Sequence, residues 1–417
     1  MAFTSLNHYL DYEWLYYAFE QTRKDGATGV DGQTAAEYAA NLEQNLRSLI
    51  ERIKLGSYQA PPTRRHYIPK SDGTQRGLGI PCFEDKVAQR AIVMLLEPIY
   101  EQEFMDCSYG FRPGRSAHQA LRAVYQGIME QGGRWVLDVD IRKYFDSIPF
   151  AELRGILGQR VTDGVVRKMI DKWLKAGVLD DGRLYYPDSG TPQGGVLSPL
   201  LSNIYLHQVL DRWFAVEVQP RLRGPSTLIR YCDDFVMLFA YKDDAERVLA
   251  VLGKRLGKYG LQLHPDKTRL VDFRYRPAAR QEVTEDAKLA TSFNFLGFTH
   301  VWVIGRWKKP IVRQTTAKDR FARTLKTFNQ ECRNMRHEPL REQHTRLCRK
   351  MRGHFAYFGI SGNYSRLAML RHHVARCWHK WLSRRSTKSK VNWAAFRRLL
   401  DVLPLPPPRI IHHYAVT

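Results

Sequence analysis

The sequence lacks paired cysteines, long apolar runs and a leader-like N-terminus. Its six Cys residues lie far apart, and no two have the Cys-x-x-Cys spacing, so we expect neither a thiolate zinc site nor a disulfide framework. No run of about 18 apolar residues is present, which argues against a membrane span. The first residues show no basic segment followed by an apolar one, so a signal peptide is not expected. We therefore expect a protein of the cytoplasm or nucleoid.

Acidic residues are scarce in the last quarter of the chain. Residues 301–417 hold 26 Lys and Arg but only 5 Asp and Glu, a net charge of +21, and the whole chain carries +23. Solubility does not require so much charge of one sign. Aromatic residues such as Trp378 and Trp381 lie among the basic ones. This mixture favours a folded nucleic-acid-binding surface over a disordered basic tail.

Two adjacent carboxylates, Asp233 and Asp234, interrupt an apolar stretch at residues 228–239. β-Branched and aromatic residues flank the pair, which predicts two strands joined by a tight turn. Charges in such a hairpin need a partner, and its only basic side chain is Arg230. A divalent cation such as Mg²⁺ suits these hard oxygen ligands. An ordinary solvated turn is the alternative, because Asp is common in turns.

A third carboxylate lies on another expected strand. Residues 135–141 alternate with period two, which predicts a strand with Asp138 and Asp140 on one face. Asp140 can meet Asp233 if the two strands are neighbours in one sheet. Two divalent ions, about 3.5–4 Å apart, could then be held between them.

A hairpin is expected at residues 64–81, with its turn at Asp72-Gly73. Lys70 and Arg76 would stand near its base, and such a pair suits a triphosphate. The register decides whether the two side chains share a face. A solvated hairpin is the alternative.

The segment 190–206 contains a glycine pair, Gly194-Gly195, and then Ser198-Pro199. The glycines allow another backbone or a base pair to come close, and Gln193 could hydrogen-bond to whatever arrives. Ser198 is expected to cap a helix with Pro at its first position. A plain loop-to-helix junction is the alternative.

The 417 residues suffice for two or three domains, and the chain shows no internal repeat. Residues 1–60 are expected to be mainly helical, with a break at Gly26–Gly32. Further helices are expected at 84–105, 116–131 and 243–259, two more within 149–176, and three near 315–336, 339–357 and 364–383. The remaining strands are expected at 184–186, in the segment that ends at Phe273, and at 293–298 near the sheet, and residues 403–408 should form a stiff extended segment.

In this order the motifs resemble those of the bacterial group II intron reverse transcriptases, also called intron maturases. The resemblance covers about residues 20–380, and the ordered set is specific although each piece alone is weak. It rests on Lys70…Arg76, Tyr109-Gly110-Phe111-Arg112-Pro113-Gly114, Asp140…Tyr144-Phe145-Asp146, Thr191-Pro192-Gln193-Gly194-Gly195, Tyr231-Cys232-Asp233-Asp234, Lys267-Thr268 and Phe295-Leu296-Gly297.

The resemblance implies an α+β fold, a right-hand polymerase with fingers, a palm built on an antiparallel sheet, and a helical thumb. The chain would divide into an N-terminal extension (1–60), fingers and palm (61–300), a strongly basic thumb or maturase domain (301–385) and a C-terminal tail (386–417). The loop Gly26–Gly32 would lie over the template.

The metal site implied by the resemblance contains two Mg²⁺ ions, with Mn²⁺ as a substitute. Asp140 and Asp233 would be the main ligands, together with the backbone of Ile141. Asp234 would be the accessory catalytic carboxylate.

The resemblance also assigns residues to the incoming nucleotide. Lys70 and Arg76 would hold its triphosphate, and Tyr144 or Phe145 would block a ribose 2′-hydroxyl. Gln193 would touch the nascent base pair. Lys267 is also expected to be a substrate-binding residue.

The implied activity is that of an RNA-directed DNA polymerase in the bacterial cytoplasm or nucleoid. Its partners would be an RNA template (group II intron RNA among the candidates), a DNA or RNA primer and dNTPs, with no membrane. Binding of intron RNA would also assist splicing. Two alternatives stay open: a splicing cofactor with an idle polymerase site, and a free-standing reverse transcriptase in DNA repair or phage defence. An RNA-dependent RNA polymerase is disfavoured by the aromatic pair Tyr144-Phe145.

Two departures from the family pattern stand out. Cys232 occupies a position where the family usually has Ala; the side chain is still small, so activity is expected, with altered primer handling. The sequence stops at Thr417 without paired Cys or a nuclease signature, so the chain is not expected to cut target DNA itself.

Overall fold

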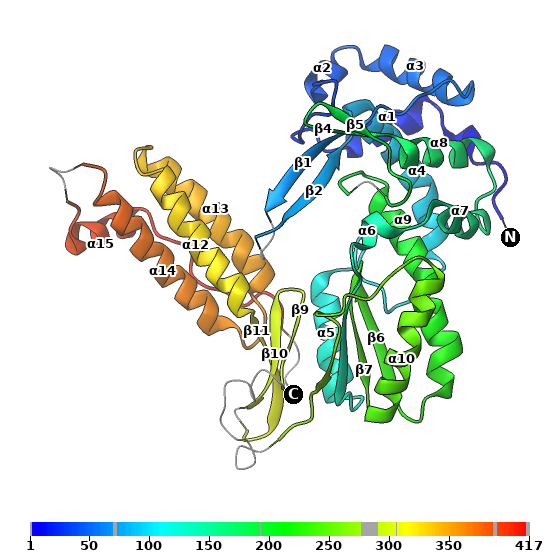
Figure 1. The fold of residues 1–417 in the computed structure, drawn as a ribbon. Coiled ribbons are helices and arrows are strands. Elements are labelled where there is room, and N and C mark those ends of the chain that lie inside the picture. Colours follow the sequence, from blue (N-terminus) through cyan, green and yellow to red (C-terminus); the bar gives the residue numbers. More distant parts are fainter. Residues whose placement is uncertain are drawn as a thin grey trace. The chain divides into compact units, whose positions relative to one another are not determined.

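The computed structural model describes residues 2–69, 73–191, 193–276, 291–305, 307–386 and 390–413. The chain folds as two compact units (Figure 1): residues 1–120 with 137–270 form unit 1, and residues 121–136 with 271–417 form unit 2. Helices and sheets occur in both, so the predicted α+β class is confirmed. Over the described ranges, no helix is both long and apolar enough to cross a membrane.

One part of unit 1 combines helices with a four-stranded sheet of the order β2-β1-β4-β5. Strands β1 and β2 form the hairpin predicted at 64–81, with Ile68 paired to Arg76. The break expected at Gly26–Gly32 lies between α1 and α2. The elements are a 3₁₀ turn (Asn7–Tyr9), α1 (Tyr12–Gln21), α2 (Ala35–Ala39), α3 (Leu42–Lys54), β1 (Thr63–Pro69), β2 (Gln75–Ile80), α4 (Phe83–Glu101), α7 (Phe150–Gly158), α8 (Gly164–Lys175), β4 (Val178–Asp180) and β5 (Arg183–Tyr185).

A second four-stranded sheet has the order β6-β7-β3-β8, and it places β7 beside β3. Residues 235–239 of β7 are all buried, as expected for a central strand covered on both faces. Helix α10 packs against β7 (Figure 1). The elements are α5 (Ala117–Met129), β3 (Trp135–Asp140), α6 (Tyr144–Ser147), α9 (Ser198–Leu206), π-helical turns (His207–Asp211, Phe214–Val218), a 3₁₀ turn (Gln219–Arg221), β6 (Ser226–Tyr231), β7 (Asp234–Phe239), α10 (Lys242–Lys258) and β8 (Arg269–Asp272).

Unit 2 combines a three-stranded antiparallel sheet, order β11-β10-β9, with a helical bundle. The basic helices bury one apolar face each, and the fully buried Trp378 lies in the core that these faces form. Its indole donates to Gln343 Oε1 at 2.9 Å. The elements are β9 (Phe293–Phe295), β10 (Phe298–Ile304), β11 (Pro310–Thr316), α12 (Lys318–Asn334), α13 (Leu340–Phe358), α14 (Tyr364–Leu382) and α15 (Trp393–Val402).

Two local predictions were wrong. Ser198 does not cap α9: the N-cap residue is Leu197, and no side chain caps the helix from that position. The amides of Val196 and Leu197 instead donate to Gln89 Oε1, at 2.9 and 3.3 Å. A distant side chain in α4 therefore takes the role that the local pattern assigned to Ser198.

The second error concerns residues 293–298, which are not one strand: they hold β9 and the first residue of β10, with a turn between them. Leu296 and Gly297 both have positive φ, 50° and 80°, and they form a turn between β9 and β10. These strands belong to their own sheet, which continues into β11 before α12 begins at Lys318. Residues 386–417 also contain a helix, α15, that the sequence analysis did not anticipate, and its Phe396 is fully buried in the bundle core.

Candidate active site

The turn between β6 and β7 consists of two residues, Cys232 and Asp233. Tyr231 pairs with Asp234 as the last pair of the ladder, so the predicted hairpin is confirmed. Cys232 has φ +59°, a left-handed conformation that side-chain-bearing residues rarely adopt. Burial raises the pKa of the Cys232 thiol to about 12, so the thiol stays protonated near neutral pH.

Asp233 lies close to Asp140, which ends the neighbouring strand β3. Burial raises the pKa of the Asp233 carboxyl above its usual range, and the charge of Asp140 adds to the rise. Its own backbone, the Cys232 side chain and the charge of Arg76 act in the opposite direction. Two partly buried carboxylates that repel each other favour a site completed by a cation.

The segment after α10 holds Asp140 from the other side. The His264 amide donates to the backbone oxygen of Asp140 at 2.8 Å, and Lys267 Nζ lies 2.9 Å from Asp140 Oδ2. Asp138, two residues earlier on the same face, pairs with Arg269 at 3.1 Å. The Lys267 ammonium therefore balances part of the negative charge at Asp140.

The backbone of Ile141 offers a further oxygen. Ile141 and Leu263 form an antiparallel bridge. On its two sides the His264 amide donates to the Asp140 carbonyl and the Arg142 amide donates to the Gln262 carbonyl, both at 2.8 Å. Successive residues of a strand direct their peptide groups to opposite sides. The Ile141 carbonyl therefore points to the side of β3 on which β7 lies.

The two aromatic residues after β3 differ in environment. Tyr144 is 2% exposed, and its hydroxyl donates to the backbone oxygen of Ser202 at 2.8 Å. Phe145 is only partly buried, with its ring 5.3 Å from that of Tyr144 in an edge-on arrangement. Of the two side chains, only that of Phe145 is partly exposed, and it makes no hydrogen bond to the backbone that would have to break if the ring moved.

A fully buried cation, Arg230, supports the turn that carries Asp233. Its Nη1 donates to the Cys232 carbonyl at 3.0 Å and to Asn203 Oδ1 at 2.9 Å. Its Nε donates to Asp211 Oδ1 at 2.7 Å. Burial by itself would lower the pKa of Arg230, but the charge and hydrogen bonds of Asp211 offset this and raise it. This role was not predicted from the sequence, although an Arg inside an apolar strand is a sign that a buried partner is required.

The motif containing Gly110 lies against the same turn. A Cβ at Gly110 would lie 2.5 Å from the Cys232 nitrogen, so only glycine fits there. Asn203 Nδ2 donates to the Gly110 carbonyl at 2.7 Å, and the Phe111 ring lies 6.2 Å from that of Tyr231. This motif therefore forms part of the support of the Asp233 turn.

Two of the predicted substrate residues, Arg76 and Gln193, lie on segments that are hydrogen-bonded to each other. The Gly79 amide donates to the Gln193 carbonyl at 2.6 Å, which ties the loop before α9 to β2. Arg76, exposed on the same strand, is near enough to Asp233 for its charge to lower that carboxyl's pKa. Lys70 lies outside the described residues, so its position relative to Arg76 stays a prediction.

The donor set at Asp140 and Asp233 fits Mg²⁺ in kind, because carboxylate and carbonyl oxygens are its preferred protein ligands. Asp234 is exposed at the start of β7. Among the His, Cys, Asp and Glu residues that the structure describes, no three converge as a metal-binding group. The structure thus brings together two of the three predicted carboxylates.

Comparison with known proteins agrees with this geometry. Residues 68–300 match the family model described as reverse transcriptase (RNA-dependent DNA polymerase). Protein YkfC of Escherichia coli (strain K12) is 36% identical over 293 residues, which cover 62% of this chain and 76% of that protein.

The group II intron-encoded protein LtrA of Lactococcus lactis subsp. cremoris is 41% identical over 217 residues, covering 51% of this chain but only 35% of LtrA. Nuclear intron maturase 2, mitochondrial, of Arabidopsis thaliana is 30% identical over 177 residues, covering 33% of this chain and 24% of that protein. The chain therefore belongs to the reverse transcriptase family, in the group that contains the group II intron reverse transcriptases and maturases.

Proposed function

We propose that the chain is an RNA-directed DNA polymerase of the group II intron type, which also binds intron RNA to assist splicing. The observation that carries the proposal is the position of Asp233, in a two-residue turn beside Asp140 at the end of the adjacent strand. Phosphoryl transfer needs positioning and charge neutralisation more than covalent chemistry. A pair of carboxylates on neighbouring strands would supply the positioning, and the divalent cations that it would hold would supply the charge neutralisation.

In this proposal, residues 61–300 form the fingers and palm. The β6-β7-β3-β8 sheet is the palm, and the β2-β1-β4-β5 sheet belongs to the fingers. Residues 1–60 are the N-terminal extension, residues 301–385 the thumb and maturase domain, and residues 386–417 the C-terminal segment that contains α15.

Asp140, Asp233 and the Ile141 carbonyl would hold two Mg²⁺ ions, with Asp234 as the accessory carboxylate. When bound, the ions lower the pKa of the primer 3′-hydroxyl and neutralise the departing pyrophosphate. Asp233 must be ionised to act as a ligand, and burial, which raises the pKa of its carboxyl, works against that ionisation. Lys267 Nζ lies 2.9 Å from Asp140 Oδ2, so a metal ion bound through that oxygen would have to displace the ammonium or share the oxygen with it.

Arg76 and Lys70 would bind the triphosphate of the incoming nucleotide, because a forked guanidinium and a point charge both suit phosphate oxygens. Phe145 is the better candidate for the residue that excludes a ribose 2′-hydroxyl, since Tyr144 is committed to the Ser202 backbone. Gln193 would contact the nascent base pair from the loop tied to β2.

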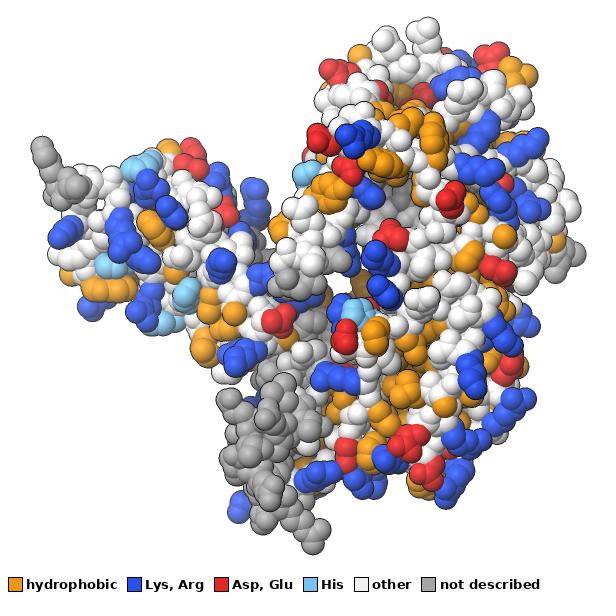
Figure 2. All heavy atoms as spheres, viewed as in Figure 1, with side chains coloured by type: hydrophobic (Ala, Val, Ile, Leu, Met, Phe, Trp, Pro, Cys, Tyr) orange, Lys and Arg blue, Asp and Glu red, His pale blue; other side chains and the backbone are white. Residues whose placement is uncertain are grey.

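RNA binding is supported by charge. Figure 2 shows Lys and Arg side chains spread over the visible face of α12, α13 and α14, with few acidic ones between them. Template and intron RNA would be held mainly through phosphates and 2′-hydroxyls, so binding is expected to weaken steeply with salt.

Primer extension on an RNA template with Mg²⁺ tests the proposal. Deoxynucleotides should be incorporated in preference to ribonucleotides, and Asp233→Ala should abolish extension while RNA binding survives. Asp266→Ala, which removes an exposed carboxylate from the nearby loop, is the matched control and should retain activity.

Other results would select the alternatives. A folded, RNA-binding protein without extension would favour the splicing cofactor, and preferential ribonucleotide incorporation would favour an RNA polymerase. Splicing assistance that persists in Asp233→Ala would show that the two roles are separable.

A further inference from the structure

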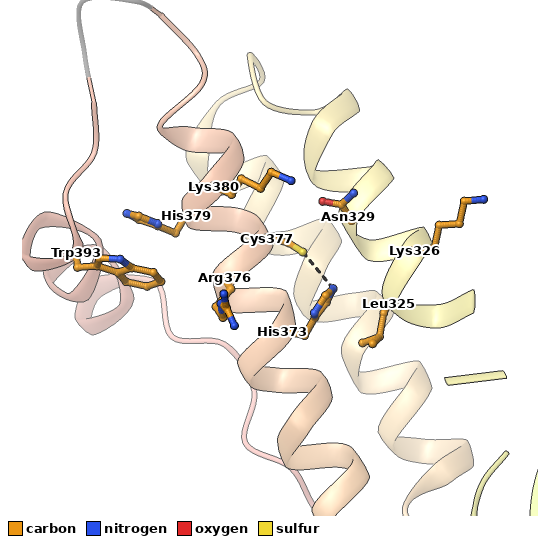
Figure 3. A pocket seen from close by; sticks show the side chains of 9 residues that line it. All are labelled: Leu325, Lys326, Asn329, His373, Arg376, Cys377, His379, Lys380 and Trp393. Atoms are coloured by element: carbon orange, nitrogen blue, oxygen red, sulfur yellow. Dashed lines mark hydrogen bonds between the residues drawn. The ribbon is translucent and has the colours of Figure 1, made fainter. Parts of the chain in front are cut away.

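A hollow of about 540 Å³ lies between α12, α14 and the start of α15, all within unit 2 (Figure 3). It is lined from α12 by Lys326 and Asn329, from α14 by Arg376 and Lys380, and from α15 by Trp393. The polymerase chemistry proposed above uses none of these residues. The hollow is therefore a separate feature to be explained.

The aromatic wall of the hollow is held in place. Trp393 is 48% exposed, and its ring stacks on His379 at a centroid distance of 3.8 Å with an interplanar angle of 20°. His379 Nε2 lies 2.8 Å from the Val391 carbonyl oxygen, which fixes the imidazole plane. Phe396, one turn after Trp393, is fully buried. Because the exposed ring is already held in place, a base can stack on it without a further loss of side-chain conformational entropy.

The charges around the hollow have one sign. Lys326, Arg376 and Lys380 are exposed basic residues, and none of the described residues that line the hollow is acidic. The nearby carboxylate of Glu331 is engaged by Lys350 at 2.9 Å. Such a concentration of positive charge attracts phosphate.

A second hollow, of about 490 Å³, shares Trp393 with the first. Arg371 and Arg397 line it, together with Tyr364, whose ring is 54% exposed. Cations and exposed rings therefore occur on both sides of Trp393. Alternation of cationic and aromatic groups is the arrangement by which proteins bind single-stranded nucleic acid without reading its sequence.

We propose that the two hollows around Trp393 bind a single-stranded segment of polynucleotide, with a base stacked on Trp393 and phosphates held by Arg376, Lys380 and Lys326. This inference deepens the proposed function and rests on it, since RNA is the polymer that the chain is proposed to bind. The site would anchor a single strand independently of the Asp140–Asp233 centre.

The test measures binding of short fluorescein-labelled oligo(rU) and oligo(dT) to the full chain, with excess unlabelled RNA–DNA duplex present to fill the polymerase site. Trp393→Ala should weaken binding about 5- to 150-fold, the range seen when a stacking aromatic is removed. Trp393→Phe keeps an aromatic face and should bind nearly as the original protein does. The sugar whose binding depends on Trp393 identifies RNA or DNA as the natural strand.

The charge arm of the test uses Arg376→Gln/Lys380→Gln, which should reduce the slope of log affinity against log salt by about 1.4, since each phosphate contact to a single strand contributes about 0.7. The control, Lys254→Gln/Lys258→Gln, removes two exposed cations at the same spacing on α10 and should change little. Equal weakening by both pairs, or unchanged binding in Trp393→Ala, would overturn the site.

Primer extension on a preformed duplex separates this inference from the function on which it rests. Trp393→Ala should extend normally while it loses oligonucleotide binding, and Asp233→Ala should show the reverse. If the original protein extends no primer but binds oligo(rU) through Trp393, the polymerase proposal fails and the binding site stands.

Discussion

The guanidinium of Arg230 and the carboxylate of Asp211, both fully buried, form a two-pronged ion pair with N–O distances of 2.7 and 2.5 Å. The same guanidinium holds the carbonyl of Cys232. The position of Asp233 therefore depends on an ion pair that lies within the core and never meets substrate.

Replacing Arg230 alone should be severe. Arg230→Met leaves the Asp211 carboxylate buried without its cation, and removing one partner of a buried pair costs about 3–5 kcal/mol. The double variant Arg230→Met/Asp211→Leu should recover part of this loss. Urea denaturation of the full chain measures the free energies of unfolding, and equal losses in the single and double variants would contradict the explanation.

The effect of a substitution at Cys232 on activity should depend on the shape of the new side chain. Ala fits the buried site and the left-handed backbone, so Cys232→Ala should retain primer extension. Cys232→Val places a β-branched residue at positive φ, which costs on the order of 1–3 kcal/mol, and should shift the Asp233 turn. Circular dichroism, with extension assays on both variants, tests this; a fully active Val variant would show that the turn tolerates strain.

Phe145 and Tyr144 should differ in their control of sugar selection. Phe145→Ala removes the partly exposed ring and should increase ribonucleotide use relative to deoxynucleotide use by about 10- to 200-fold, the range by which a pocket discriminates substrates that differ by one small group. Tyr144→Phe loses only the bond to Ser202 and should keep selectivity while lowering stability by about 1 kcal/mol. The ratio of kcat/KM for dNTP to kcat/KM for rNTP measures the selectivity of each variant. If Tyr144→Phe lost selectivity and Phe145→Ala kept it, the role of excluding the 2′-hydroxyl would belong to Tyr144.

The sequence predicted the features that depend on neighbouring residues. The Asp233 hairpin follows from the β-branched and aromatic residues that flank the acidic pair, and the strand ending at Asp140 follows from local alternation. The condition that their strands be adjacent is met by β7 and β3. Contacts between distant segments were not predictable in this way. No local pattern pairs Arg230 with Asp211, or assigns Gln89 to the amides before α9.

Unit 2 shows the same limit. The three helices expected near 315–336, 339–357 and 364–383 are confirmed as α12, α13 and α14. The hairpin of β10 and β11 was missed because basic residues such as Lys308 and Lys309 break the apolar pattern between its strands. Helix α15 was missed because it is short and its burial rests on packing around Phe396.

Removing the Lys267 ammonium should strengthen metal binding at the site. The ion pair with Asp140 is half-exposed, so Lys267→Met should change stability by less than about 1 kcal/mol. The variant should bind Mn²⁺ more tightly, because no ammonium competes for Asp140 Oδ2. Titration followed by electron paramagnetic resonance measures this, with Lys258→Met as a control; weaker Mn²⁺ binding in Lys267→Met would refute the competition.

Asp85 should make stability depend on pH. Its carboxyl is 2% exposed and accepts hydrogen bonds from Tyr58 and Trp173, and burial raises its pKa to about 7. Between about pH 4 and pH 7 the folded state then binds more protons than the unfolded state, so stability falls as the pH rises through this window and levels off above it. Asp85→Asn should abolish that fall in melting temperature; an unchanged pH profile would assign the effect to other groups.

The contact between Gly79 and Gly194 restricts any attempt to re-engineer the protein. A Cβ at Gly194 would lie 2.8 Å from the Gly79 oxygen, and the residue has φ +111°, so the loop and β2 meet backbone to backbone. If the chain is the proposed polymerase, libraries aimed at unnatural nucleotides should therefore hold Gly194 constant and vary the side chain of Gln193 instead. The backbones of the strand and the loop then stay fixed relative to each other. Acceptance of new nucleotides has to come from changes in the side chains that project from them.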